Sequence, residues 1–143
     1  MKVRVKKLHP AAILPTYGSE GAACFDLHAI EAGVVSNEGS EVFRTGLAFE
    51  IPEGHVMQVF SRSGHGFKND VRLSNSVGII DADYRGEVMV KLRADALFSN
   101  LQVKPGDRIA QAIIMPYPSV RFELADDLTE TARGAGGLGS TGA

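Results

Sequence analysis

The sequence NSVGIIDADYRGEV, residues 75–88, carries the strongest indication of the fold. Its apolar run Val77–Ile80 ends at two acids, and Tyr84–Gly86 supplies turn formers before a second apolar run begins. Short apolar runs bounded by turn residues are typical of β-strands. We therefore predict a hairpin here, with one strand over 77–81 and the other over 87–93.

The same pattern recurs on both sides of this stretch. Turn formers at Pro52–Gly54 and Pro105–Asp107 again separate apolar runs, and no segment has the periodicity of a 12-residue amphipathic helix. The other predicted strands are 2–6, 25–30, 42–51, 55–62, 71–74, 107–115 and 120–124. Eight or more short strands imply an all-β sandwich or barrel.

The last eleven residues have a different composition, with five glycines and no periodicity. Glycine permits close backbone approach, and Arg133, Ser140 and Thr141 carry groups that bind phosphate oxygens. We predict an all-β domain over 1–132 and a flexible phosphate-binding arm over 133–143. A frayed terminus is the alternative interpretation of the arm.

Residues 61–66 form a second candidate anion site. Arg62 offers a planar guanidinium, Ser63 a hydroxyl, and Gly64 and Gly66 exposed amides. We predict a tight turn here, and an ordinary polar loop is the alternative.

Composition excludes several classes of function. The 143 residues hold 15 Lys and Arg against 17 Asp and Glu, so no positive field attracts long nucleic acid. The apolar run 109–115 is far shorter than the roughly 20 residues that cross a bilayer, so we expect no membrane segment. The lone cysteine, Cys24, cannot form an internal disulfide, and we expect a cytoplasmic location, or the host cytoplasm for a viral protein.

Five motifs in order carry a resemblance to a known family. They are AACFDL (22–27), SRSGHGFK (61–68), NSVGIIDADYRGEV (75–88), GDRIAQAI (106–113) and RGAGGLGSTG (133–142). Over almost its whole length the chain resembles the trimeric all-β dUTPases, the deoxyuridine triphosphate nucleotidohydrolases. The resemblance implies a jelly-roll-like β-barrel or sandwich assembled as a homotrimer, with each active site closed by a neighbouring chain's arm. It also implies hydrolysis of dUTP to dUMP and pyrophosphate, which supplies dUMP and keeps uracil out of DNA.

In this resemblance the third motif forms the uracil and deoxyribose pocket. The residues that would bind base and sugar are Asn75, Gly78, Ile79, Ile80, Tyr84 and Met89. Backbone groups in a fixed orientation distinguish uracil from cytosine, because the wrong base leaves buried polar groups unpaired.

The resemblance also assigns the catalytic and phosphate-binding groups. Asp81 would hold and deprotonate the water that attacks the α-phosphorus. Gln111 would lie near that phosphate, although its side chain could instead cap a neighbouring backbone group. The remaining substrate ligands would be Arg62, Ser63, Gly64, Arg133, Leu138, Gly139, Ser140 and Thr141. Asp26 would support Mg²⁺ through water, with a structural strand residue as the alternative. Asp83 and Asp107 are expected to be turn residues only.

Two other functions fit the same fold. One is a dCTP deaminase, which needs a glutamate beside the exocyclic amine. The other is a nucleotide-gated regulator that binds dUTP and contacts an additional protein, a partner that the sequence does not identify.

The chain departs from the family pattern at two positions. Cys24 stands where the family commonly has glycine, two residues before Asp26. Leu138 stands where the family usually has an aromatic residue that stacks on uracil.

We predict that Leu138→Phe lowers the KM for dUTP, because a planar ring adds about 0.5–1.5 kcal/mol of stacking that leucine lacks. Steady-state kinetics of the two proteins would check this, and an unchanged or higher KM would contradict it.

Overall fold

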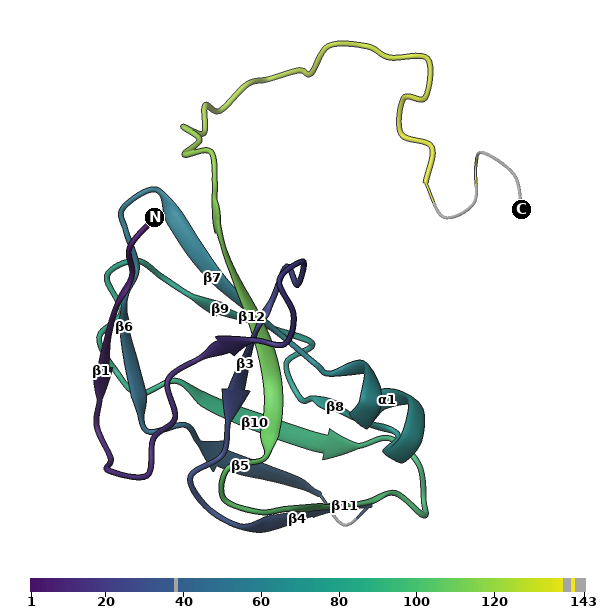
Figure 1. The fold of residues 1–143 in the computed structure, drawn as a ribbon. Helices are drawn as coiled ribbons and strands as arrows, with labels where there is room; N and C mark the ends of the chain where they lie inside the picture. The colour runs from purple at the N-terminus through teal and green to yellow at the C-terminus, as the bar shows by residue number, and fades with distance from the viewer. Residues whose placement is uncertain (38, 138–139, 141–143) are drawn as a thin grey trace.

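The computed structural model describes residues 1–37, 39–137 and 140. This part of the chain is almost entirely β, with a single short helix, α1 (Ser63–Asn69) (Figure 1). The strands are β1 (Arg4–Lys7), β2 (Thr16–Tyr17), β3 (Phe25–His28), β4 (Gly33–Ser36), β5 (Ser40–Arg44), β6 (Leu47–Glu50), β7 (His55–Phe60), β8 (Val71–Leu73), β9 (Val77–Ile80), β10 (Met89–Ala94), β11 (Asn100–Val103) and β12 (Arg108–Pro116). The all-β prediction is confirmed. The helix is too short to span a bilayer, and the described residues contain no other candidate.

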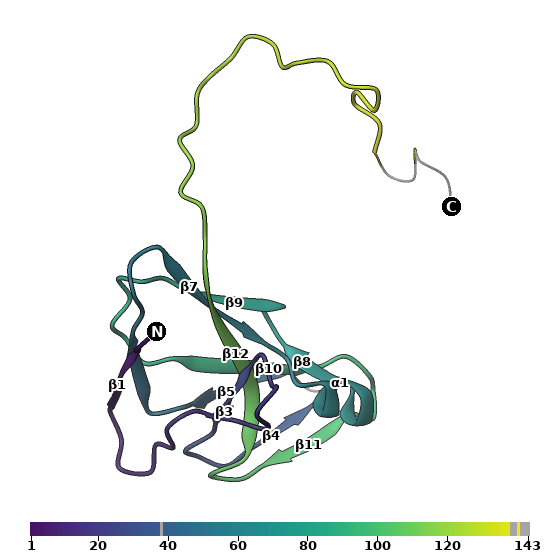
Figure 2. The ribbon, with the colours of Figure 1, turned by 45° about the horizontal axis from the view of Figure 1, so that its top comes forward.

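Four antiparallel sheets make up the body of the molecule. The largest has the strand order β2-β3-β12-β7-β9, and a second has the order β5-β10-β8. The pairs β1-β6 and β11-β4 complete the fold. Strands that pair are mostly distant in sequence, since β12 lies between β3 and β7 (Figures 1 and 2). Crossovers of this kind are typical of jelly-roll-like folds.

One hydrophobic core joins the four sheets. Its largest fully buried side chains include Leu27, Val35, Phe43, Leu47, Met57, Leu73, Leu92 and Ile109. Because side chains alternate across a strand, burial of Phe25 and Leu27 turns Asp26 and His28 to the opposite face of β3. The core therefore determines which polar side chains face the candidate site.

The single strand predicted over 42–51 is wrong, because the structure has two strands there. Between β5 and β6 the chain leaves the three-stranded sheet and pairs with β1. Gly46 lies at this corner with φ +67°, and a Cβ there would lie 2.9 Å from the Ala12 Cβ. Glycine is the residue that tolerates both constraints.

The predicted hairpin over 77–93 is also wrong in its pairing. Both strands exist, but β9 pairs with β7, whereas β10 pairs with β5 and β8. The turn, closed by the Tyr84 amide donating to the Asp81 carbonyl, thus connects two sheets. The apolar pattern predicted the strands, but it did not specify their partners.

Residues 120–124 were predicted as a strand and form none. Val120, Phe122 and Leu124 are 64%, 93% and 100% exposed, and the segment after Pro116 extends away from the body (Figures 1 and 2). A strand needs a neighbour for its backbone groups, and its own chain offers none here. The short strands β2, β4 and β11 were missed. The division between domain and arm at residue 132 stays a prediction.

We predict that Thr45→Val lowers the free energy of unfolding by about 1–3 kcal/mol, because it leaves buried backbone groups unsatisfied. The fully buried Thr45 hydroxyl donates to the Val88 carbonyl at 2.6 Å and accepts from the Leu47 amide at 3.3 Å. Urea denaturation followed by circular dichroism would measure the change. Thr16→Val, at an exposed threonine, is the matched control, and equal effects of the two substitutions would contradict the prediction.

Candidate functional site

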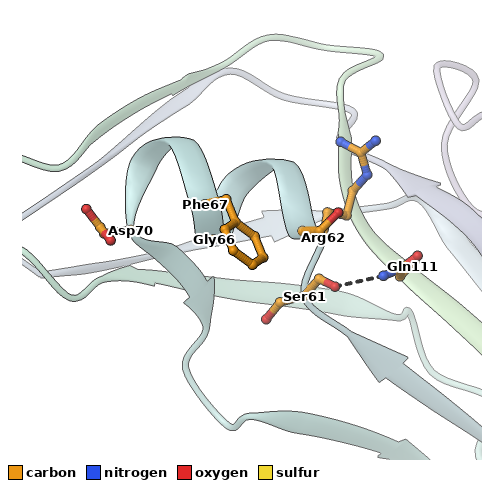
Figure 3. A pocket seen from close by; sticks show the side chains of 7 residues that line it. Ser61, Arg62, Gly66, Phe67, Asp70 and Gln111 are labelled. Atoms are coloured by element: carbon orange, nitrogen blue, oxygen red, sulfur yellow. Dashed lines mark hydrogen bonds between the residues drawn. The ribbon is translucent and has the colours of Figure 1, made fainter.

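An open pocket of about 470 Å³ lies where the end of β7 meets α1 and β12 (Figure 3). We call it the α1 pocket. Its lining residues are Ser61, Arg62, Ser63, Gly66, Phe67, Asp70 and Gln111.

The tight turn predicted at residues 61–66 is instead the start of α1. Arg62 is the extended N-cap residue, and its carbonyl accepts from the amides of His65 and Gly66, each at 3.1 Å. The first amides of a helix have no partner inside the helix. Ser63 and Gly64 therefore present their amides at the N-terminal end of α1, beside Arg62.

Two hydrogen bonds hold the floor of the α1 pocket in place. Gln111 Nε2 donates to the Ser61 carbonyl at 2.9 Å (Figure 3), and the Leu73 amide donates to Ser61 Oγ at 2.9 Å. The Gln111 side chain thus makes the hydrogen bond to a neighbouring backbone group that was the alternative interpretation, and no described residue donates to its Oε1.

Asp26 lies at the centre of an ion-pair cluster beside this pocket. Its Oδ1 is 3.3 Å from Arg62 Nε and its Oδ2 is 3.2 Å from Arg108 Nη1. The Asp26 side chain is 13% exposed, so pairing both oxygens offsets the cost of burying the charge. Asp26 is also the cross-strand partner of Gln111. Strand pairing therefore brings together three predicted site residues, Asp26, Arg62 and Gln111.

Two histidines border the cluster. Burial lowers the pKa of His28, and Arg108 and Arg62 add to this while Asp26 opposes it. Burial and then Arg62 lower the pKa of His65, against a smaller opposing effect of Asp107. An ordinary histidine has a pKa near 6.5, so both rings are neutral at pH 7. Two arginines, Arg62 and Arg108, and two carboxylates, Asp26 beside the α1 pocket and Asp70 in its lining, carry the charge of this region.

A second pocket of about 220 Å³ lies at the far end of β9, and we call it the Tyr84 pocket. Its lining residues are Ile79, Ile80, Asp81, Tyr84, Glu87, Val88 and Met89. Tyr84 Oη donates to the Glu87 carbonyl at 3.1 Å, and a Cβ at Gly86 would displace the end of the Tyr84 side chain from this position. The Asp81 carboxylate is exposed and has no ion-pair partner among the described residues.

Other predicted site residues lie elsewhere. Asn75 and Gly78 lie towards the opposite end of β9, where Gly78 packs against Val59. Arg133 and Ser140 lie on the segment that extends away from the body (Figure 1). Leu138, Gly139 and Thr141 lie outside the described residues. Asp83 and Asp107 lie at turns, as expected.

The α1 pocket and the Tyr84 pocket share no lining residue. Ile80 pairs with Met57, so Asp81 lies near Val56, six residues along the chain from Arg62. At about 3.3 Å per extended residue, the backbones of Asp81 and Arg62 are about 20 Å apart. Within one chain, Asp81 and Arg62 cannot act on the same phosphate.

Sequence reasoning missed Arg108, His28 and His65 as members of this region. Arg108 had a signal, because it is the cation of the fourth motif immediately before the apolar run. His65 had a signal too, because it follows Arg62 by three residues in the second motif, whereas only the folded strands bring His28 to Arg62.

Comparison with known proteins agrees with this geometry. The dUTPase family model matches residues 11–142. The deoxyuridine 5'-triphosphate nucleotidohydrolase of Picosynechococcus sp. is 44% identical over 144 residues, covering 99% of both chains. Its counterpart from Helicobacter pylori strain J99 is 40% identical, covering 99% of this chain and 97% of the other.

Solved structures agree in fold. The dUTPase of Staphylococcus bacteriophage 80alpha with dUPNHPP superposes with a TM-score of 0.89 at 25% identity over 99% of both chains. A mutant dUTPase from phage phi11 of S. aureus, described with a structural Mg(II) ion, has a TM-score of 0.80 at 23% identity, over 89% of this chain and 98% of that one. With a family match across nearly the whole chain and relatives at 40% and 44% identity, the chain belongs to the dUTPase family and is a dUTP diphosphatase.

Proposed function

We propose that the protein converts dUTP to dUMP and pyrophosphate by attack of an Asp81-held water on the α-phosphorus. The observation that carries this is the exposed Asp81 carboxylate beside Tyr84 and Met89, which has no ion-pair partner within residues 1–37, 39–137 and 140. The water oxygen forms a bond to phosphorus, the bond to the bridging oxygen breaks, and the water proton passes to Asp81. Pyrophosphate leaves with the electron pair of the broken bond.

The Tyr84 pocket would bind the nucleoside. The Tyr84 ring, fixed through its hydroxyl to the Glu87 carbonyl, would pack under the deoxyribose, and Met89 would line the base site. The backbone of Ile79 and Ile80 would read the base edge. Asn75, the other residue expected to read the base, lies away from this pocket in the free chain.

The α1 pocket would bind the triphosphate. Arg62 and the start of α1 at Ser63 and Gly64 supply a guanidinium, a hydroxyl and backbone amides, which are phosphate ligands. The Asp26 carboxylate holds Arg62 in position before substrate arrives. Fixed positive groups stabilise the charge that develops on the leaving pyrophosphate.

The residues beside this pocket fit Mg²⁺ only if the phosphate oxygens of the substrate also bind the ion. The described residues contain no cluster of three or more His, Cys, Asp or Glu, and both Asp26 oxygens already face arginines. Mg²⁺ keeps several waters and binds largely through substrate phosphates, so one carboxylate reached through water suffices. Asp26 would be that carboxylate, and the ion would neutralise phosphate charge when bound.

The separation of the two pockets supports a shared site. Asp81 of one chain and Arg62 of another must meet if both act on one dUTP, which favours the homotrimer.

The segment 117–137 also exposes Val120, Phe122 and Leu124, side chains that a soluble protein normally covers with a partner. We propose that this segment packs on a neighbouring chain and brings Arg133 and Ser140 to its site. A cytoplasmic location remains our expectation.

The deaminase alternative lacks its proton shuttle. Glu87 is the glutamate of the Tyr84 pocket, but Arg44 binds its carboxylate at 2.9 Å and the Gly46 amide binds it at 2.7 Å. Both oxygens of this carboxylate therefore already have partners within the chain and do not face an open position for a substrate amine.

We predict that Asp81→Asn lowers kcat for dUTP by about 10²- to 10⁴-fold, because the amide cannot accept the water proton. Pyrophosphate release from dUTP with Mg²⁺ would be measured. Asp83→Asn, in the same turn, is the matched control and should keep wild-type activity. An Asp81→Asn enzyme as active as this control would contradict the proposal.

The shared site predicts complementation between two inactive variants. Arg62→Gln and Asp81→Asn chains, unfolded together and refolded as an equal mixture, should recover about a quarter of wild-type activity, because random assembly restores both groups at that fraction of sites. Each variant refolded alone should stay inactive. A mixture no more active than its components would show that a single chain builds the site.

A further inference from the structure

A β-bulge at the start of β12 turns Arg108 towards the Asp26 carboxylate. The register of β12 against β3 shifts between Arg108 and Ala110. The neighbours Ile109 and Ala110 are both fully buried, because the extra residue interrupts the alternation of side chains. In a regular strand Ile109 would lie on the face of Gln111, and Arg108 would point into the core. The bulge therefore places an arginine where alternation would place an isoleucine.

Arg108 is the second arginine on one carboxylate. Its Nη1 lies 3.2 Å from Asp26 Oδ2, and Arg62 Nε lies 3.3 Å from Asp26 Oδ1. The Arg108 carbonyl also accepts from Arg62 Nη1 at 3.3 Å. In Figure 3 the Arg62 guanidinium points away from Phe67 and Asp70. Within one chain, Arg62 is therefore held by Asp26 and by the Arg108 backbone.

The surrounding charges show what Arg108 contributes. Asp70 lines the α1 pocket and Asp26 lies beside it, so Arg62 alone would face two carboxylates. The Asp26 side chain is largely buried, and a buried carboxylate is costly unless it is paired. With a single arginine, that pairing would leave no positive charge for a phosphate. Arg108 supplies a second positive charge, so Asp26 can be paired without Arg62.

Arg108 itself is not part of the pocket. Arg62 belongs to the lining of the α1 pocket, whereas Arg108 does not. The Arg108 side chain is 52% exposed and contacts the Asp26 oxygen that Arg62 leaves unused. An effect of Arg108 on a ligand in this pocket is therefore expected to act through Asp26.

We propose that Arg108 is a positioning residue for the triphosphate, an inference that rests on the proposed role of the α1 pocket. Arg108 neutralises Asp26, so the charge of Arg62 is available to a phosphate oxygen. When Arg62 turns to the phosphate, Arg108 keeps the Asp26 carboxylate paired and avoids the cost of leaving it alone. Without Arg108, Asp26 would retain Arg62 and weaken phosphate binding.

Calorimetric titration with an imido analogue of dUTP, which resists hydrolysis, tests this in the absence of Mg²⁺. We expect Arg108→Gln to raise Kd by about tenfold, the loss expected for one charge-assisted hydrogen bond. Arg108→Lys should keep a Kd near that of wild type, because the contact to Asp26 uses a single nitrogen. Arg93→Gln, at a similarly exposed arginine that pairs with Asp95, is the matched control and should leave Kd unchanged.

A double-mutant cycle separates an effect through Asp26 from a direct attraction between Arg108 and phosphate. In an Asp26→Asn background no carboxylate competes for Arg62, so added Arg108→Gln should change Kd by less than about twofold. An equal loss in both backgrounds would show direct attraction and overturn the proposal. The ligand control is dUMP, which lacks the two terminal phosphates and should bind wild type and Arg108→Gln equally. An equal loss for dUMP would also overturn the proposal.

Three further results would contradict the inference. They are no binding of the analogue by the wild-type protein, an unchanged Kd with Arg108→Gln, and an equal loss with Arg93→Gln. Circular dichroism and gel filtration of each variant show that the fold and assembly are intact.

Arg62→Gln distinguishes failure of this inference from failure of the proposed function. An unchanged Kd with Arg62→Gln would overturn both the phosphate site and the role of Arg108. A loss with Arg62→Gln but none with Arg108→Gln would overturn the role of Arg108 alone.

Discussion

The position of β12 between β3 and β7 is the constraint on which the α1 pocket depends. Its ladder places Gln111 opposite Asp26 on one side and opposite Phe60 on the other. Arg62 follows Phe60 by two residues and so reaches Asp26. A slip of one residue in either register would turn Gln111 to the opposite face. The buried alanines and isoleucine of β12 hold that register, because only one register buries them.

The proposed division of the site between chains ties the proposed chemistry to assembly. One chain presents Arg62 and Gln111 at one pocket and Asp81 with Tyr84 at another, about 20 Å along the strands. The cations that we propose for neutralising phosphate charge are thus separated from the carboxylate that we propose as the base. Under this proposal the site is complete only when copies meet, which is consistent with the exposed apolar side chains after Pro116.

Much of the fold followed from apolar alternation and turn residues. Most predicted strands, such as those at Phe25 and His55, appear within a residue or two of their expected limits. The failures share one cause, which is that a strand's partner is not encoded locally. The run over 42–51 breaks at Gly46 because the chain changes sheets, and 120–124 remains unpaired because its own chain has no edge for it.

The sequence by itself determined which chemical groups the candidate site contains. It also determined the arrangement of those site residues that are neighbours along the chain. Ile79, Asp81, Tyr84 and Met89 meet in one pocket because a single turn spans them. Only the tertiary structure decided that Asp26 pairs with Arg62 and Arg108, that the histidines at this cluster are neutral, and that Asp81 lies far from Arg62. Local spacing places side chains within a turn, whereas contacts between distant strands depend on a register that the whole core selects.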